Sequence, residues 1–215
     1  MQDACEQMVE QQVRAWEVLD PAVLDAMHNI PREEFLPEKF KRLAHSDASL
    51  AIRDDFLLPC PSVQGKILQA LELEENDPVL LLGGGVGYLA TCLAFLGGTV
   101  TVCDADEKLL DLIRNTAHRL GYKNLQVQQL DWGTALQAGT KKYAAISSQY
   151  AFSRIPESLQ QALQINGRAV LFEGEAPLIS CVVIERIGEN EFLRRSLFET
   201  EMSVYPLKSA PEFSF

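Results

Sequence analysis

The sequence lacks the features that mark several common classes of protein. It has no run of about 18 apolar residues, so we expect no membrane-spanning helix. Polar residues recur every few positions near the N-terminus and no apolar segment stands there, so we expect no secretory signal. The five cysteines show neither CxxC nor zinc-like spacing, and the three histidines are scattered, so we expect no metal site. Free thiols in a reducing cytoplasm are the expected state.

Basic residues are also scarce. The 215 residues include 19 Lys and Arg against 30 Asp and Glu, which gives a net charge of −11. An acidic surface repels phosphate backbones, and the basic runs at 39–42, 141–142 and 194–195 are short and isolated. We therefore expect no nucleic-acid partner. The length and the 47% hydrophobic content are those of a globular chain that needs neither disulfides nor a metal to fold.

Two regions and a short tail are expected. Residues 1–75 carry helical signals and form an N-terminal extension packed on the main domain. Asp20 before Pro21 is a typical helix start, and Ser62 is the expected N-cap of a helix over 63–73. Residues 76–207 form the main domain, and residues 208–215 are a tail.

The main domain alternates strands with helices. Strands are expected at 79–82, 99–103, 125–130, 143–147 and 168–172, with helices at 88–96, 106–120 and 156–163. Strands at 179–187 and 192–200, joined by a turn at 188–190, are expected to form a hairpin. Such alternation with short connections predicts an α/β fold, a doubly wound and mostly parallel sheet that ends in an antiparallel hairpin.

A glycine loop lies between the first of these strands and the next helix. Gly83, Gly85 and Gly87 would let a ligand approach free N–H groups at the positive end of the helix dipole. Dinucleotide binders place a third glycine of GxGxxG where Tyr88 stands, which argues against NAD or FAD. The GxGxG pattern instead resembles that of class I S-adenosylmethionine-dependent methyltransferases. The alternative is a tight strand-to-helix turn that binds nothing.

Acidic residues follow the next two strands. Asp104 lies about twenty residues after Gly83, where such folds use a carboxylate to bind ribose hydroxyls. Its alternative role is helix capping, which Asp106 could equally fill. Asp131 and its neighbour Trp132 are placed to meet an adenine ring. The alternatives are a solvated carboxylate and a tryptophan that covers the edge of the core.

The order of motifs along the chain resembles the protein-L-isoaspartate O-methyltransferase family. The resemblance begins with MVEQQVRAW at 8–16, VLDP at 18–21 and PREEFLP at 31–37, and continues at Asp47. It then includes 79–88, Asp104, RLGY at 119–122, Asn124, Asp131, NGR at 166–168 and YPL at 205–207. It covers nearly the whole chain, and its N-terminal part is far more specific than the glycine loop.

The resemblance implies a Rossmann-like domain that transfers a methyl group from S-adenosylmethionine to the carboxylate of an isoaspartyl residue. S-adenosylhomocysteine would be the product, and damaged cytoplasmic proteins or peptides awaiting repair would be the substrates. A carboxylate with a pKa near ~4 is already ionised, so the reaction needs no general base. Gly83, Gly85 and Gly87 would hold the methionine part, Asp104 the ribose, and Asp131 with Trp132 the adenine.

The active-site segment departs from the family pattern. A Thr-Ile-Ser segment of the family aligns with Leu57, Leu58 and Pro59. Proline has neither a hydroxyl nor a backbone N–H, so two potential hydrogen-bond donors are lost. Losing one well-placed donor at a transition state costs about 2.7–4 kcal/mol. We therefore assign no catalytic residue from the sequence.

Further departures leave alternatives open. Two loop glycines of the family align with Arg53 and Asp55, an acidic residue with Leu81, and an aspartate with Ala144. The chain is thus expected to be a divergent member. The alternative is a catalytically impaired member that binds the cofactor or a protein partner, with the apolar run at 56–59 as the candidate surface. Methylation of another small carboxylate or an amine is a third possibility, and the sequence does not indicate an oligomeric state.

Overall fold

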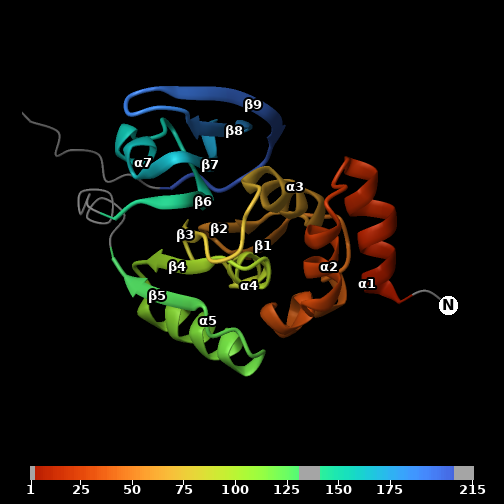
Figure 1. Ribbon diagram of the computed structural model, residues 1–215. Helices are drawn as coiled ribbons and strands as arrows, with labels where there is room; N and C mark the ends of the chain where they lie inside the picture. Colours follow the sequence, from red (N-terminus) through yellow and green to blue (C-terminus); the bar gives the residue numbers. More distant parts are fainter. Residues whose placement is uncertain (1–2, 131–140, 206–215) are drawn as a thin grey trace, which may run out of the picture.

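The computed structural model describes residues 3–130 and 141–205, and its centre is a seven-stranded sheet (Figure 1). The strand order is β5-β4-β3-β6-β7-β8-β9. Five strands are parallel: β3 (Pro78–Leu82), β4 (Thr99–Asp104), β5 (Leu125–Gln129), β6 (Tyr143–Phe152) and β7 (Leu163–Glu175). The antiparallel pair β8 (Leu178–Arg186) and β9 (Phe192–Thr200) completes the sheet. The predicted fold class is confirmed.

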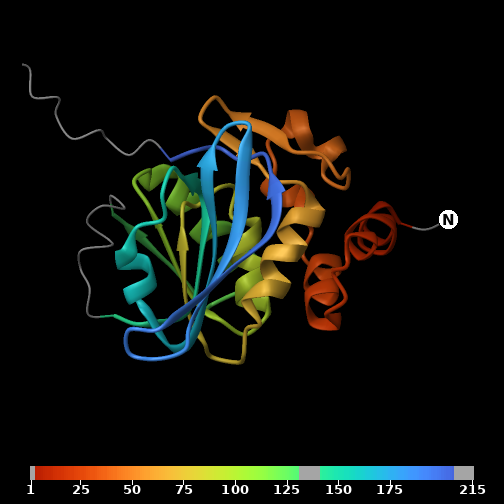
Figure 2. The same ribbon diagram turned by 90° about the horizontal axis from the view of Figure 1, so that it is seen from above.

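Helices cover both faces of this sheet. Chain order runs from β3 outward to β5 on one side and from β6 outward to β9 on the other. Because parallel crossovers are right-handed, the helices of the two halves lie on opposite faces. Figure 2 shows α3 (Pro61–Leu71) and α7 (Glu157–Gln161) on opposite sides of the sheet. The direction in which the chain adds strands reverses between β3 and β6. Doubly wound sheets bind their ligands at such a point.

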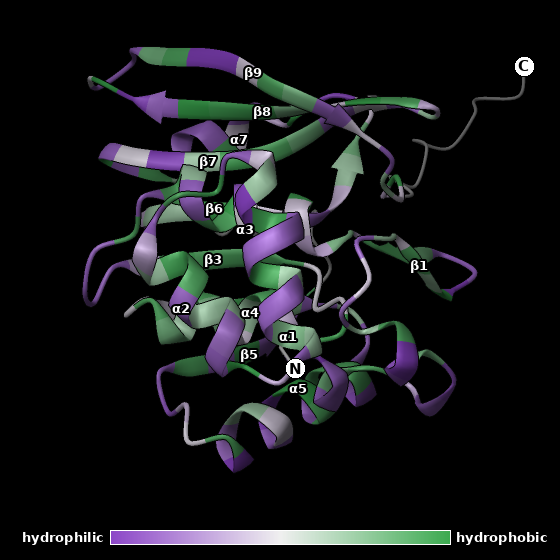
Figure 3. Ribbon diagram, turned by 90° about the vertical axis from the view of Figure 1, so that its right-hand side faces the viewer, coloured by the Kyte–Doolittle hydropathy of each residue, from purple (hydrophilic) through white to green (hydrophobic). Residues whose placement is uncertain are grey.

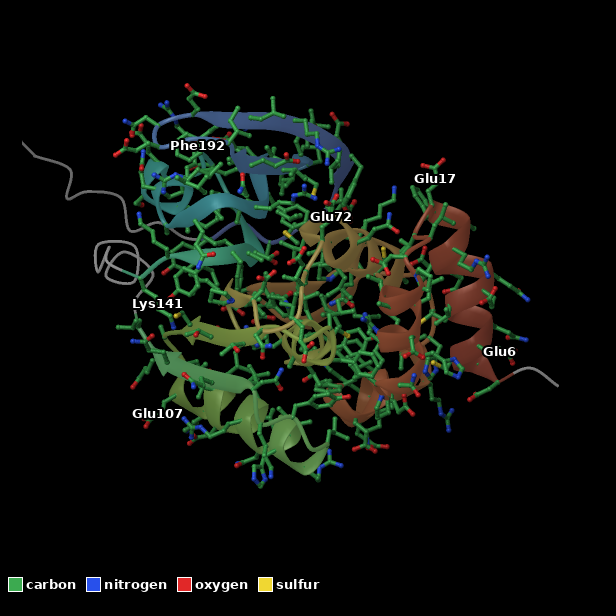
Figure 4. The ribbon with its side chains drawn as sticks, in the orientation of Figure 1. Glu6, Glu17, Glu72, Glu107, Lys141 and Phe192 are labelled. Atoms are coloured by element: carbon green, nitrogen blue, oxygen red, sulfur yellow. The ribbon has the colours of Figure 1, made fainter. Side chains whose placement is uncertain are left out.

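Hydrophobic burial explains the central strands and helices. Residues 79–82 of β3 are all buried, as expected for a parallel strand covered on both faces, and Figure 3 shows β3 as apolar. The helix α4 (Tyr88–Phe95) is also almost wholly buried. In contrast, α5 (Glu107–Arg119) is amphipathic: Asp106 caps it by accepting the N–H of Lys108 at 3.0 Å, and exposed Glu107 follows in its first turn (Figure 4).

The N-terminal residues pack beside α3 and α4. They form α1 (Ala4–Gln7), η1 (Met8–Val13), η2 (Arg14–Trp16), α2 (Pro21–Asn29), η3 (Arg32–Phe35) and η4 (Glu38–Leu43). As predicted, Asp20 caps α2 by accepting the N–H of Ala22 at 2.8 Å. Met8, Val13 and Met27 are fully buried and belong to the same hydrophobic core as the sheet.

The expectation that the first 75 residues are helical is wrong at 50–58. There β1 (Leu50–Arg53) and β2 (Phe56–Leu58) form an antiparallel hairpin. Each strand is too short to show a clear period, so helical neighbours dominated the interpretation. The helix α3 begins at Pro61, and Ser62 is not its cap. Instead, the Asp47 carboxylate accepts the N–H of Ser62 at 3.0 Å, so a residue distant in sequence supplies the cap.

Two strands differ in length from the prediction. The strand β6 continues to Phe152, and β7 begins at Leu163, which shortens the helix between them to α7. The short segment at 203–205 runs beside the extended part of β6. Ser203 accepts the backbone N–H of Ala151 at 2.8 Å, and Tyr205 donates its own N–H to the carbonyl of Ala151 at 2.8 Å. The Ser203 hydroxyl also accepts the N–H of Leu57 at 2.8 Å, so this segment joins β6 to the β1–β2 hairpin.

Arg32 is a charged side chain buried in the centre of this assembly, with 1% of its surface exposed. Its guanidinium donates to the Pro59 carbonyl at 3.1 Å and to Oε1 of Gln64, and it stacks on the Tyr88 ring with 5.0 Å to the ring centroid. Burial lowers the pKa of Arg32, because desolvation disfavours the charged form. The side chain thus ties η3 to the end of the hairpin, to α3 and to α4.

We predict that Asp47→Ala lowers the free energy of unfolding by about 1 kcal/mol, because it leaves the N–H of Ser62 without its acceptor at the start of α3. Urea denaturation followed by circular dichroism measures the change. Asp25→Ala is the control, since Asp25 is exposed on α2, and its effect should stay within about 0.5 kcal/mol. Equal losses for the two variants would show that the carboxylate does not cap α3.

Candidate functional site

The glycine loop has the left-handed backbone expected of it, but the N–H groups of Gly83 and Gly87 are not free, because they donate to the carbonyls of Cys103 at 2.8 Å and Gly84 at 2.9 Å. Gly83, Gly85 and Gly87 have φ angles of +83°, +61° and +91°, in the left-handed region that side chains disfavour. The loop leads from β3 into α4, next to the point where the strand order reverses. Every residue from 83 to 87 is buried. The turn is therefore tightly built, with little of its own surface exposed.

Helix α5 covers one side of this loop. A Cβ added at Gly84 would lie 2.5 Å from Cδ1 of Ile113, and one at Gly87 would lie 3.0 Å from Cγ1 of the same residue. Such distances are too short for ordinary contact. A side chain at Gly84 or Gly87 would therefore require Ile113 to shift, whatever the loop binds.

Asp104 joins the loop to the end of β4. Its carboxylate accepts the N–H of Gly84 at 2.7 Å and the N–H of Asp106 at 3.0 Å, while Asp106 itself caps α5. A carboxylate has about four lone-pair sites, so Asp104 retains capacity to accept hydroxyl groups. Its role as a ribose ligand stays a prediction, and the capping role considered for Asp104 belongs to Asp106.

Side chains from two other elements cover the opposite side of the loop. A Cβ at Gly85 would lie 3.0 Å from Cζ of Phe56, in β2, and 3.0 Å from Cδ of Gln149, in β6. Gln149 is 1% exposed, and among the described residues no acceptor lies within hydrogen-bond distance of its Nε2. An unsatisfied buried donor is costly, so this donor next to Gly85 marks a place where a ligand acceptor would be stabilised.

Arg53 links these side chains. Its Nη2 donates to the Tyr150 hydroxyl at 3.0 Å, its Nη1 to the Gly85 carbonyl at 3.4 Å, and its Nε to the Asp55 carboxylate at 3.1 Å. The guanidinium also lies over the Phe56 ring, 5.0 Å from its centroid. Burial raises the pKa of Tyr150 to about 12, so its hydroxyl is neutral at physiological pH.

An irregularity in β6 directs Gln149 and Tyr150 toward the loop. Ser147 pairs with Val170 and Ala151 pairs with Phe172, so β6 has extra residues between these two pairs. A bulge of this kind changes the direction of side chains. Sequence analysis missed both residues. The available signal was Gln149 itself, a large polar side chain in a buried strand.

The serines before this bulge have structural roles. The Ser147 hydroxyl donates to the Val170 carbonyl at 3.0 Å, and the Ser148 hydroxyl donates to the Tyr150 carbonyl at 2.8 Å. Neither hydroxyl belongs to a nucleophilic triad among the described contacts.

The predicted interaction surface at 56–59 is wrong. Phe56 is 1% exposed, Leu58 is fully buried and Pro59 is buried, so the segment belongs to the core. The Pro59 carbonyl accepts the guanidinium of Arg32. The apolar character of the run therefore reflects packing of the hairpin against the loop rather than a free surface.

The remaining candidate positions are dispersed. Leu81 is fully buried in β3, and Ala144 is half-buried near the start of β6. Asp131 and Trp132 lie outside the described residues. In the described ranges 3–130 and 141–205, no group of His, Cys, Asp and Glu side chains is arranged to hold a metal ion.

A cleft of about 340 Å³ adjoins the loop where the loop faces η3 and β1 of the N-terminal region. Its walls come from η3, β1, α5 and the loop itself: Glu34, Phe35, Leu36, Pro37, Ile52, Arg53, Gly85, Val86, Leu109, Leu112 and Thr116. Most of these side chains are apolar. Arg53 and Gly85 therefore lie on the boundary between this cleft and the covered side of the loop.

Two further observations concern residues outside this site. All five cysteines are free thiols. None of the helices in the part of the chain that the structure describes is long and apolar enough to cross a membrane.

Known proteins match this chain in sequence and fold. The family model for protein-L-isoaspartate(D-aspartate) O-methyltransferase matches residues 3–201. A protein-L-isoaspartate O-methyltransferase of Rhodopseudomonas palustris is 36% identical over 191 residues, which cover 88% of this chain and 87% of that protein. One from Petrotoga mobilis is 34% identical and covers 76% of this chain and 77% of its own.

Solved structures agree on the fold. A Plasmodium falciparum structure, assigned as a protein-L-isoaspartate O-methyltransferase in complex with S-adenosyl-L-homocysteine, superposes with a TM-score of 0.77 at 16% identity, covering 94% of this chain and 98% of its own. Another solved structure of a protein-L-isoaspartate O-methyltransferase superposes with a TM-score of 0.79 at 20% identity. The superposition covers 93% of this chain and 65% of that one. The family match over residues 3–201 confirms the resemblance seen in the motifs, and the chain belongs to the protein-L-isoaspartate(D-aspartate) O-methyltransferase family.

Proposed function

We propose that this chain transfers the methyl group of S-adenosylmethionine to the carboxylate of an isoaspartyl residue in damaged proteins. The observation that carries the proposal is the family match from residue 3 to 201, at 36% identity to a curated relative. The glycine loop supports it, because its left-handed glycines stand where the strand order reverses. The five free thiols are in keeping with a reducing cytoplasm as its location.

The residues around the loop fit such a cofactor in part. The backbone at Gly83, Gly85 and Gly87 would hold the methionine part, and Asp104 would accept the ribose hydroxyls. The unpartnered Nε2 of Gln149 would donate to an acceptor on the methionine part. Asp131 and Trp132 remain the candidates for adenine. The Phe56 and Gln149 side chains pack against Gly85, so a ligand that approached Gly85 from that side would have to displace them.

The chemistry asks for positioning more than for acid or base catalysis. S-adenosylmethionine, when bound, supplies a methyl group on a cationic sulfur that leaves as a neutral thioether. The isoaspartyl carboxylate, with a pKa near ~4, is already ionised, so no residue of the chain has to remove a proton. Orienting two reactants lowers a barrier by about 7–11 kcal/mol. The buried loop and its covering side chains would exclude water from the reacting groups.

We predict that S-adenosylhomocysteine binds with a dissociation constant below about 1 mM, or about −4 kcal/mol, in a calorimetric titration. Radioactive methyl transfer to an isoaspartyl peptide should exceed that of the heat-inactivated protein. The same peptide with a normal aspartyl residue is the matched control and should gain no label. Binding without transfer would identify an impaired member of the family, while absence of both in the folded protein would overturn the proposal.

Pro59 stands where the family resemblance places a serine, and its carbonyl is held by Arg32. We predict that Pro59→Ser raises kcat on the isoaspartyl peptide at least about tenfold, because it returns a hydroxyl donor worth about 2.7–4 kcal/mol at a transition state. The measurement is initial rate at saturating peptide and cofactor. Pro156→Ser, at the start of α7, is the control and should leave kcat unchanged. An unchanged kcat for Pro59→Ser would show that the hydroxyl is not what limits the rate.

A further inference from the structure

The β1–β2 hairpin closes the side of the glycine loop that α5 leaves open. From β2, Phe56 reaches within 3.0 Å of a Cβ position at Gly85. From the bulge in β6, Gln149 reaches the same point. The Phe56 and Tyr150 rings pack with centroids 5.4 Å apart, so hairpin and bulge contact each other as well as the loop. This side of the loop, at Gly85, is therefore covered by the chain itself.

Arg53 makes the polar contacts that hold this arrangement. It lies in β1, and its guanidinium bonds the loop through the Gly85 carbonyl and the bulge through the Tyr150 hydroxyl. Asp55, in the turn of the hairpin, fixes the orientation of the same guanidinium through Nε. Hydrogen bonds from a charged group are stronger than neutral ones, and a planar guanidinium can bond several partners at once. One side chain thus connects three elements.

The positions of Arg53 and Asp55 are informative. The family resemblance places bare glycines at both. The two substitutions are not independent, because the side chains that they introduce are bonded to each other at 3.1 Å, and Arg53 also donates to the Gly85 carbonyl of the loop. A bare backbone at these positions would leave the Gly85 carbonyl and the Tyr150 hydroxyl without the guanidinium that joins them.

The covered space is not an ordinary apolar core. Its Gln149 Nε2 is buried without an acceptor and lies against Gly85 of the loop, where a bound acceptor would remove that cost. On the basis of the proposed function, we propose that Arg53 is a latch. It holds the β1–β2 hairpin closed over the cofactor site, and the cofactor binds only when the hairpin opens.

A closed majority state weakens binding in a calculable way. The apparent dissociation constant equals the intrinsic one divided by the fraction of molecules that are open. A hairpin closed in about nine molecules of ten therefore weakens binding about tenfold. Removing the latch should restore the affinity lost to the closed state. A gain in affinity distinguishes a latch from a structural residue, because the loss of a structural residue would weaken binding.

The experiment compares Arg53→Ala with the wild-type chain in calorimetric titrations with S-adenosylhomocysteine. We expect Arg53→Ala to bind up to about tenfold more tightly. Tyr150→Phe, which removes one contact of Arg53 and keeps the ring, should show a smaller gain. Arg14→Ala is the matched control: Arg14 forms an exposed ion pair with Glu10 at 2.9 Å on the N-terminal helix, and its loss should leave affinity unchanged.

Amide hydrogen exchange provides a readout without ligand. Exchange in residues 50–58 should be faster in Arg53→Ala than in the wild-type chain, while exchange in β7 and β8 should not change. Unchanged affinity, weaker binding, or unchanged exchange at 50–58 in a folded Arg53→Ala protein would each overturn the latch. If neither protein binds up to about 1 mM, the proposed function fails, and exchange at 50–58 alone decides whether Arg53 holds the hairpin. If Arg53→Ala does not fold, Tyr150→Phe decides in its place.

Discussion

The buried guanidinium of Arg32 is the interaction on which the N-terminal half of the structure depends. Removing a charge from water costs several kcal/mol, and in the described residues no carboxylate forms an ion pair with this one. The cost is offset by the Pro59 carbonyl, the Gln64 side chain and the face of Tyr88. These partners belong to the end of the hairpin, α3 and α4, so the charge is tolerable only when all three elements are in place. The bond from Arg32 to the Pro59 carbonyl therefore fixes the end of the hairpin relative to α3 and α4.

Two sets of features surround the glycine loop. The first fixes the path of the backbone: the left-handed glycines, the Asp104 carboxylate that accepts the N–H of Gly84, and the reversal of strand order. The second is a group of side chains packed against the loop, and it is polar as well as aromatic, since Arg53 and Gln149 lie beside Phe56. The Nε2 of Gln149 lacks an acceptor next to Gly85, and a ligand acceptor at this point would satisfy it, which favours a closed site over a lost one.

Patterns in the sequence predicted most of the fold, but they did not predict the hairpin and the bulge that pack against the glycine loop. Periodicity and glycines sufficed for β3, α4 and the loop, because a buried parallel strand and a strand-to-helix turn have strong local signals. The hairpin at 50–58 was missed, since its strands are too short for a period and its contacts are with residues far along the chain. The bulge that presents Gln149 and Tyr150 was missed because register irregularities have no signal in one sequence. The run at 56–59 was misread as surface, since hydrophobicity alone does not say what covers it.

The hydrogen bond between the N–H of Leu57 and the Ser203 hydroxyl has a consequence for biosynthesis. The hairpin is made early in translation, whereas the segment that secures it, and that also lies along Ala151, is made almost 150 residues later. At roughly 5–20 residues per second, the ribosome needs many seconds to cover that distance. During this interval Leu57 lacks its partner, so the wall beside the glycine loop is assembled last. A chaperone or protease that acts on the nascent chain would therefore meet the hairpin before the site is closed.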